Sequence, residues 1–245
     1  RDPQGEIRVY WGGPEGVSPA GASTTLPIGP GRPQAPAGED AELAQYAEWV
    51  ADAQPLVETV RLNGAPHLFV PREDAFLLIP ARGDRTFGPA ITLECGRPMA
   101  LAAGDVNGDG YVDLAVACRE PWGDEECSWI YWGSAEGFSA GRRTRLASRR
   151  ACHVAVADLD GDGCDDVVLC QNHTEASFTT ESLVYRGTRQ GVADAPARLT
   201  SEDARQAFVA WPAPDGEPRL VFVNHMARGS KGNVNAFIYP GGPDG

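Results

Sequence analysis

An internal repeat constrains this chain more than its composition does. The segment Tyr131–Ser139 (YWGSAEGFS) has a twin at Tyr10–Ser18 (YWGGPEGVS), and weaker copies begin at Tyr185 and Tyr239. The interval from Tyr131 to Tyr185 is 54 residues, and the interval from Tyr185 to Tyr239 is again 54. Similarity at a fixed period of this length indicates that one small structural unit is copied along the chain.

A second motif repeats in phase with the first. Asp105–Asp113 (DVNGDGYVD) recurs 53 residues later as Asp158–Asp166 (DLDGDGCDD). Within one period, short alternating or wholly apolar runs such as 154–156 and 167–170 predict strands, and Gly-rich turns separate them. Four short strands in about 54 residues is the size of one β-propeller blade, so the sequence predicts an all-β fold.

One interval in the repeat is too long. From Tyr10 to Tyr131 there are 121 residues, 13 more than two periods of 54. The excess coincides with a Pro/Gly/Ala-rich segment over 27–38 and a helical pattern over Asp40–Ala53. We therefore predict one short inserted helix, and a surface helix that covers a hydrophobic gap is a simpler reading of it than a functional lid.

The two Asp/Gly motifs, here called the first loop (Asp105–Asp113) and the second loop (Asp158–Asp166), carry the strongest chemical signal. Each offers side-chain oxygens at positions 1, 3, 5 and 9, a backbone carbonyl at position 7 and Gly at position 6 for a sharp turn. Calcium takes six to eight oxygen ligands, so we expect two calcium ions. The predicted ligands are Asp105, Asn107, Asp109, the carbonyl of Tyr111 and Asp113, and in the second loop Asp158, Asp160, Asp162, the carbonyl of Cys164 and Asp166.

The flanking residues argue against an EF-hand. That motif needs Glu at position 12 between two helices, whereas position 12 here is Val116 or Leu169 in a strand-like run. The alternative is an acidic turn without metal, in which the clustered carboxylates would repel each other. Two further hairpins lack the pattern, because Asn63-Gly64 is a tight-turn signature and Trp211 stands where the second loop has Asp158.

The pattern Asp-x-(Asp/Asn)-x-Asp-Gly-x-x-Asp between strands, on a blade-length period, resembles the FG-GAP (VCBS-type) repeats. The segment YWGSAEGFS looks like the turn between outer strands in bacterial members. The resemblance implies an integrin-α-like, calcium-binding, seven-bladed β-propeller, which would need about 380 residues. We therefore expect about four blades of a seven-bladed ring, completed by a longer chain or a partner chain, with a complete small propeller as the alternative.

The chain is accordingly predicted to be a single propeller segment. Its parts are the outer strands of one blade (1–32), the linker and helix insertion (33–54), a blade without metal (55–94), two calcium blades (95–150 and 151–200) and an incomplete blade without metal (201–245).

The cysteine pattern bears on the compartment. None of the six cysteines lies in a Cys-x-x-Cys pair, so a zinc site is weakly supported. Their even number, together with loops that need millimolar calcium, favours an oxidising location, secreted or at the cell surface, with the periplasm as a further option. Cys118–Cys127 is the favoured disulfide, and Cys170 is either disulfide-bonded or a buried thiol.

Polar residues recur where inner strands are predicted to end. Asn172-His173 and Asn224-His225 occupy equivalent places, and Arg119, with Trp122 close by, is their counterpart in the earlier blade. The strand direction puts these residues on the face opposite the two loops. There they either bind a sugar or another polar ligand, or only cap the strand ends.

Charge and motifs narrow the function. With 21 basic and 34 acidic residues the formal net charge is −13, which disfavours nucleic acids and anionic membranes as partners. No apolar run reaches the length of about 18 residues that a membrane helix needs, and no nucleophile elbow, phosphate loop or dinucleotide fingerprint occurs. We expect a non-enzymatic, calcium-stabilised extracellular propeller that contacts proteins or glycans in adhesion or structural assemblies. The alternative is a lectin or polysaccharide lyase that uses the face opposite the loops.

Overall fold

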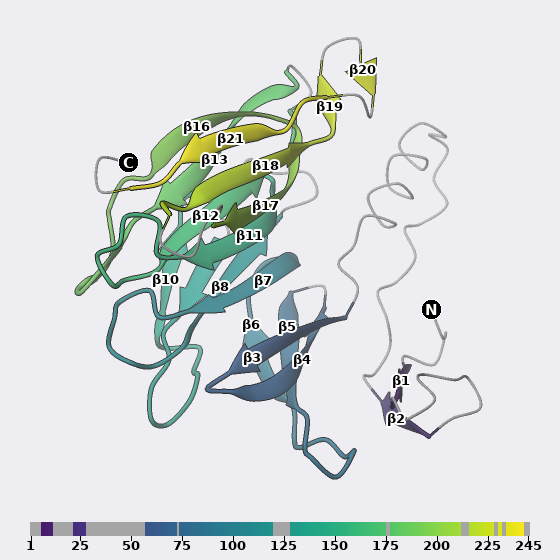
Figure 1. Cartoon of the computed structure of the whole chain (residues 1–245). Helices are drawn as coiled ribbons and strands as arrows, with labels where there is room; N and C mark the ends of the chain where they lie inside the picture. The colour runs from purple at the N-terminus through teal and green to yellow at the C-terminus, as the bar shows by residue number, and fades with distance from the viewer. Residues whose placement is uncertain are drawn as a thin grey trace.

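The computed structural model of this chain describes residues 6–11, 22–27, 57–72, 74–119, 128–174, 177–211, 216–227, 230–231 and 234–242. These residues form antiparallel sheets and contain no helix (Figure 1). The prediction of an all-β fold is therefore confirmed. The helix predicted over Asp40–Ala53 lies outside the described residues.

Four consecutive sheets in the described part of the chain share one construction, in which antiparallel strands pair in chain order. The first sheet contains β3 (Glu58–Leu62), β4 (Ala65–Pro71), β5 (Ala75–Pro80) and β6 (Ile91–Glu94). The second contains β7 (Pro98–Gly104), β8 (Asp113–Cys118), β9 (Ser128–Tyr131) and β10 (Arg143–Leu146). The third contains β11 (Ala151–Ala157), β12 (Asp166–Gln171), β13 (Thr179–Tyr185) and β16 (Ala197–Glu202), and the fourth β17 (Ala204–Ala210), β18 (Arg219–Asn224) and β21 (Phe237–Pro240).

Three short hairpins complete the described structure. They pair β1 (Glu6–Tyr10) with β2 (Ser23–Pro27), β14 (Gly187–Thr188) with β15 (Gly191–Val192), and β19 (Met226–Ala227) with β20 (Ser230–Lys231).

The β1–β2 hairpin repeats the outer hairpin of the second sheet. The indole Nε1 of Trp11 donates to Thr24 Oγ1 at 2.9 Å, and the Nε1 of Trp132 donates to Thr144 Oγ1 at the same distance. The twin motifs found in the sequence therefore make the same local structure.

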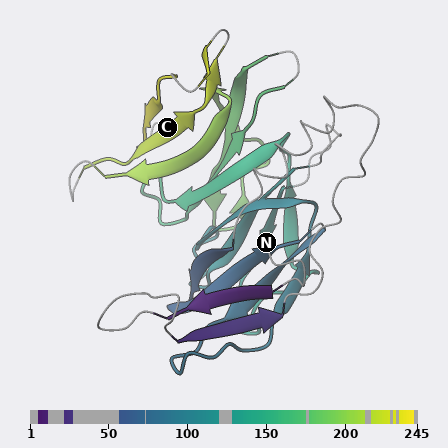
Figure 2. The ribbon, with the colours of Figure 1, turned by 90° about the vertical axis from the view of Figure 1, so that its right-hand side faces the viewer.

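The sheets pack face to face in chain order, as the colour sequence in Figure 2 shows. One apolar cluster lies between each successive pair of sheets, beginning with Ile7 and Val9 of the β1–β2 hairpin against the first sheet. Strand β8 is buried along its whole length because both of its faces are covered. Full burial of an apolar side chain stabilises a fold by about 1.5–3 kcal/mol, so these interfaces hold the sheets together.

The repeated tyrosine has one structural role in three sheets. The hydroxyls of Tyr185 and Tyr239 donate to the backbone carbonyls of Ala147 and Thr200, at 2.7 and 2.8 Å, and the hydroxyl of Tyr131 donates to the carbonyl of Glu94. Each bond ties the third strand of one sheet to the outer-strand region of the sheet before it. The 54-residue spacing of the tyrosines therefore reflects a contact between neighbouring units.

Removing one of these hydroxyls should weaken a junction between sheets. For Tyr185→Phe we expect a loss of about 1 kcal/mol in the free energy of unfolding, because a partly buried hydrogen bond is removed. Urea denaturation measures this loss. Tyr111→Phe, on an exposed side chain, is the control. Equal stability of the Tyr185 variant and the wild type would show that the bond is not a structural tie.

Candidate functional site

The two Asp/Gly loops occupy the same place in two successive sheets. The first loop joins β7 to β8, and the second joins β11 to β12. Gly108 and Gly110 in the first loop, and Gly161 and Gly163 in the second, have φ between 62° and 89°. This left-handed conformation is readily available only to glycine, and it explains the DGDG-type spacing.

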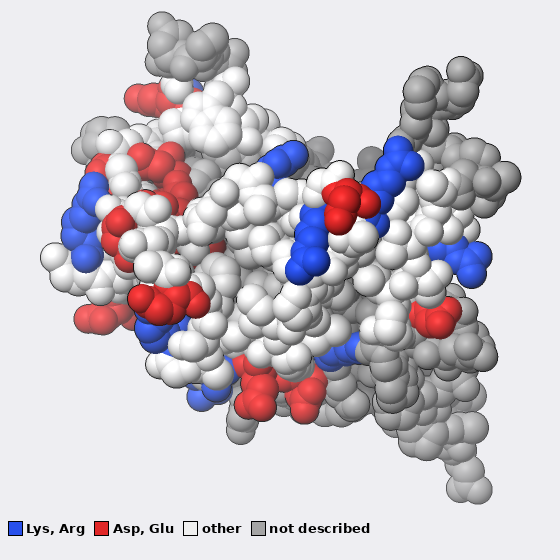
Figure 3. Space-filling model, turned by 90° about the horizontal axis from the view of Figure 1, so that it is seen from below, with Lys and Arg blue, Asp and Glu red and all other residues white. Residues whose placement is uncertain are grey.

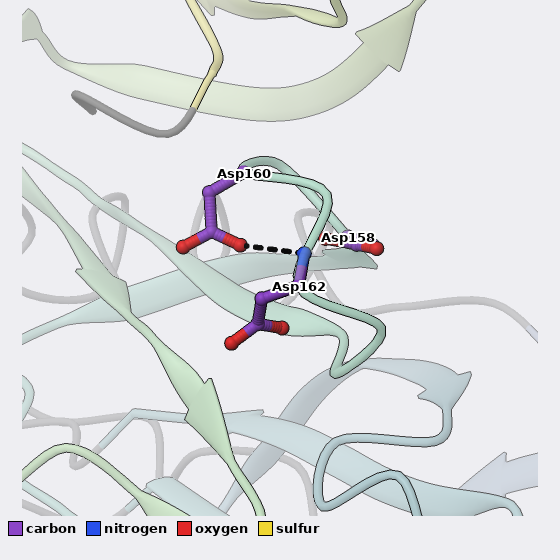
Figure 4. A group of neighbouring side chains, drawn as sticks. All are labelled: Asp158, Asp160 and Asp162. Atoms are coloured by element: carbon purple, nitrogen blue, oxygen red, sulfur yellow. Dashed lines mark hydrogen bonds between the residues drawn. The ribbon is translucent and has the colours of Figure 1, made fainter.

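In the second loop three carboxylates converge. The ligand oxygens of Asp158, Asp160 and Asp162 all lie within 4.8 Å of one another. Backbone amides shape the cluster, because Asp158 accepts from Gly161 N at 2.7 Å and Gly163 N at 3.0 Å. Figure 4 shows the three side chains on this single turn, with the 3.2 Å bond from Asp162 N to Asp160 dashed.

The first loop repeats the arrangement with one amide in place of an acid. Asp105 accepts from the amides of Asp109 and Gly110, at 3.0 and 2.9 Å, and Asp109 accepts from Tyr111 N at 2.8 Å. The side chain of Asn107 donates to Asp109 Oδ2 at 3.0 Å. The carboxylates are therefore held on the inside of a tight turn, as in the second loop.

The last acid of each loop is buried and has a structural role. Asp113 accepts from Val106 N at 3.0 Å and Gly133 N at 2.8 Å, and Asp166 accepts from Leu159 N at 3.3 Å and Gly187 N at 2.9 Å. Burial raises the pKa of both carboxyls to about 6. The predicted ligand set is thus brought together only in part, since Asp166 is not among the three carboxylates that converge.

The donor chemistry of the loops fits a hard cation. The second loop presents three carboxylates, of which Asp160 is also paired with Arg186. Oxygen-only donors on a glycine-containing turn are what calcium prefers. A cation would also offset the repulsion that three adjacent negative charges create.

At the opposite ends of the strands, a second group of polar residues surrounds Asp203. The side chain of Asp203 is fully buried, and its Oδ1 accepts from His173 Nδ1 at 2.8 Å, His173 N at 3.0 Å and Asn172 Nδ2 at 3.2 Å. Its Oδ2 accepts from His225 Nδ1 and Arg205 Nη2, both at 3.1 Å. We call these five residues the Asp203 cluster.

Most residues predicted for this face do come together. Arg119 Nη1 donates to Asn172 Oδ1 at 3.2 Å, so the second sheet is tied to the cluster. Asn224 lies beside it, bonded to Glu202 N at 3.0 Å and to the carbonyl of Asn235 at 2.8 Å. Trp122 lies outside the described residues.

Sequence reasoning missed Asp203 and Arg205, although a signal for Asp203 exists. Charged residues recur at intervals of 53 residues, namely Arg97, Arg150 and Asp203. Each of them directly precedes the first strand of a sheet. Arg150 and Asp203 also share a positive φ, of 52° and 47°. The recurrence of a charged residue at the same position of each repeat could therefore have identified Asp203 from the sequence.

The cysteines do not supply the expected covalent link in this part of the chain. No disulfide joins any two of the described cysteines, and Cys170 is a fully buried thiol. Of the two readings left open for Cys170, the buried thiol is therefore the right one. The predicted pair Cys118–Cys127 falls partly outside the described residues, because Cys127 is one of the residues that are not described.

The surface charge is mixed. On the face seen from below, Asp and Glu side chains stand in groups with Lys or Arg side chains beside them, and no continuous basic stripe crosses that face (Figure 3). Among the described residues no helix is long and apolar enough to cross a membrane.

The fold and the loops together define a class, namely a repeat protein of stacked antiparallel sheets with acidic turns between first and second strands. A family model described as an FG-GAP-like repeat matches residues 105–169. The matched segment starts at the first acid of the first loop, includes all of the second loop and ends within β12. The resemblance to FG-GAP repeats is thus confirmed for this segment. A comparison with curated proteins gives no match.

Proposed function

We propose that this chain is part of a calcium-binding β-propeller that works outside the cell or at its surface, by contacting other macromolecules and without chemistry of its own. The observation that carries the proposal is the way in which each sheet covers the next. FG-GAP-like repeats favour an interaction or adhesion role, although a fold alone does not establish a function.

The face that each sheet turns toward the next one can be compared at equivalent positions in the second, third and fourth sheets. In the second sheet, Ala102, Ala115 and Ile130 lie in register across three strands and pack against the third sheet. In the third sheet, the equivalent Ala155, Val168 and Val184 pack against the fourth. The stack is therefore built from one repeated interface.

In the fourth sheet, the same register holds Phe208, Val221 and Ile238. Phe208 is 44% exposed and Ile238 is 63% exposed, whereas the equivalent residues of earlier sheets lie in apolar clusters; Val221, between them, is buried. Large apolar side chains at a position that is core elsewhere mark a face made for another sheet. This supports a propeller that continues, with the remaining blades supplied by a longer chain or by a partner chain.

Calcium should stabilise the fold measurably. Excess chelator is expected to lower the melting temperature, because a ligand at 100 times its dissociation constant adds about 2.7 kcal/mol of stability. Asp162→Asn should remove part of this response, since it takes away one of three converging carboxylates. Asp194→Asn, an exposed acid outside the loops, is the matched control. Unchanged melting of the wild type in chelator would contradict the calcium proposal.

A second candidate function rests on the Asp203 cluster. An ionised carboxylate only accepts hydrogen bonds, so Asp203 favours a proton on Nδ1 of each histidine, and the Nε2 of a neutral histidine then serves as an acceptor. His225 is partly exposed and His173 less so. Two histidines oriented in this way suit a sugar hydroxyl, or proton abstraction from a sugar, as a lectin or polysaccharide lyase requires.

Replacing both histidines separates the two candidates. The double variant His173→Gln/His225→Gln should lose at least ten-fold in binding or cleavage of an oligosaccharide if the second candidate is right, because both oriented imidazoles are replaced by amides that cannot take up a proton. Binding of a protein partner through the sheet stack should persist if the first is right. Oligosaccharide binding by titration calorimetry and lyase turnover by absorbance report the outcome, and melting curves confirm that the variant is folded.

A further inference from the structure

We propose that the two Asp/Gly loops bind cations cooperatively, because the third sheet holds the first loop in its binding shape. This inference rests on the proposed calcium binding and adds a regulation to it. It is carried by contacts between the two loops that involve residues outside the predicted ligand sets.

Asp165 forms the central contact. Its amide donates to the carbonyl of Asp105 at 3.0 Å, and its Oδ2 accepts from the amide of Asp105 at 2.8 Å. Asp105 is the first predicted ligand of the first loop, while Asp165 lies directly before the last acid of the second loop. A movement of the second loop on cation binding therefore reaches the backbone of a ligand in the first.

Arg189 forms a second contact at the far side of the first loop. Its guanidinium donates to the carbonyl of Gly108, between the predicted ligands Asn107 and Asp109. The approach is close, because a Cβ on Gly108 would lie 2.3 Å from Arg189 Nη1 and 3.0 Å from the carbonyl of Gly163 in the second loop. The backbones of the two loops thus meet directly.

The coupling is confined to this pair of loops. On its other side the second loop also meets the fourth sheet, because Gly242 N donates to the carbonyl of Leu159 at 2.8 Å beside an open cavity lined among others by Glu217 and Pro218. The fourth sheet, however, has Trp211 at the position that corresponds to Asp158. In the first sheet the corresponding turn is Asn63-Gly64, which has no acid at these positions. Within the described ranges, the two predicted cation loops that touch each other are therefore those of the second and third sheets.

The energetic consequence is reciprocal. If a cation in the second loop raises the affinity of the first by some factor, a cation in the first must raise the affinity of the second by the same factor. Coupling between sites is typically about 5–150-fold, and three hydrogen bonds plus a close backbone approach suggest the lower end. We expect about five-fold to ten-fold.

The test is titration of the whole chain with calcium by isothermal calorimetry. In Asp162→Asn and Asp109→Asn one loop is disabled, so each variant reports the affinity of the other loop alone. In each variant, the calcium affinity of the intact loop should be about five-fold to ten-fold weaker than the affinity of the same loop in the wild type when the other loop is occupied. Arg189→Met should retain two ions and lose part of the cooperativity, because the two bonds between Asp165 and Asp105 remain. Arg198→Gln, on an exposed arginine paired with Glu181, should retain all of it.

The outcomes separate this inference from the proposed function. Two ions that bind independently, with single-loop affinities equal to those of the wild type, would overturn the coupling and leave calcium binding intact. Cooperativity in Arg189→Met that equals that of the wild type would overturn the role given to the contact between Arg189 and Gly108. Absence of any calcium binding would overturn both. Melting curves show that each variant is folded before its titration is interpreted.

Discussion

Replacing Asp203 by alanine is expected to lower the free energy of unfolding by about 3–5 kcal/mol. Removing one partner of a buried ion pair has an effect of this size because the remaining charge is left buried and unpaired. Here the loss affects the guanidinium of Arg205, the side chain of Asn172 and both histidines, which come from two sheets. Urea denaturation at neutral pH measures it.

The lowered pKa of Asp203 makes the stability of the fold depend on pH. Burial alone would raise the pKa of Asp203, but hydrogen bonds from His173 and the charge of Arg205 outweigh burial and hold the pKa well below its ordinary value. A carboxyl whose pKa is lower in the folded state contributes stability that is complete above its unfolded pKa of about 3.9 and is lost as the pH falls below it. Stability should therefore fall below about pH 4.

The matched variant for this effect is Asp203→Asn, which keeps the shape of the side chain and removes its charge. Its unfolding free energy should be lower than that of the wild type at pH 7 and should change less between pH 4 and pH 2. Asp194→Asn, on an exposed acid, should behave like the wild type. A loss below 1 kcal/mol for Asp203→Ala at pH 7 would show that the cluster is not a structural tie.

Replacing Gly187 by alanine should cost about 2–3 kcal/mol, as overpacking of a closed site does. A Cβ at this position would lie 2.4 Å from the carbonyl oxygen of Asp165 and 2.5 Å from that of Val106. Both are backbone atoms, one in each Asp/Gly loop. The turn at Gly187, just beyond the third strand, could therefore not accommodate the methyl group without moving a loop. The amide of Gly187 also donates to Asp166 at 2.9 Å, and this bond would be strained.

Gly141→Ala provides the comparison, because a Cβ at Gly141 meets nothing within 4 Å. Chemical denaturation of the two variants should show a clear loss for Gly187→Ala and little change for Gly141→Ala. Equal unfolding free energies of the two variants would mean that the segment around Gly187 moves freely relative to the loops. The close packing described for the loops would then be wrong.

The repeat made much of the fold predictable. The tyrosine and Asp/Gly motifs mark one contact and one turn that recur in each unit, so their spacing reveals both the unit and its strands. The turn at Asn63-Gly64 was equally readable, since both residues have the positive φ that such a turn needs, 49° and 78°. Local chemistry at a fixed period is visible in a single sequence.

Contacts between units were harder to predict. Apart from Arg205, the donors to Asp203 lie 22 to 31 residues away in the chain, and the residues next to Asp203 do not indicate them. The position-9 acids look like ligands in the sequence, yet Asp113 and Asp166 also hold the loop to Gly133 and Gly187, each two residues beyond the third strand of its sheet. Whether an acid of the motif also bonds to a neighbouring strand depends on which strands lie side by side. The spacing of the motif does not give that arrangement.

The measurement that tests the central claim most directly is native mass spectrometry of the protein in millimolar calcium, with Asp162→Asn and Asp109→Asn measured alongside. The account predicts two calcium ions on each wild-type chain and one on each variant, because each substitution removes a carboxylate from a different loop. A wild-type chain without bound calcium, at a concentration that saturates ordinary extracellular calcium sites, would contradict it. The acidic turns would then be purely structural, and the Asp203 cluster would remain as the proposed ligand site.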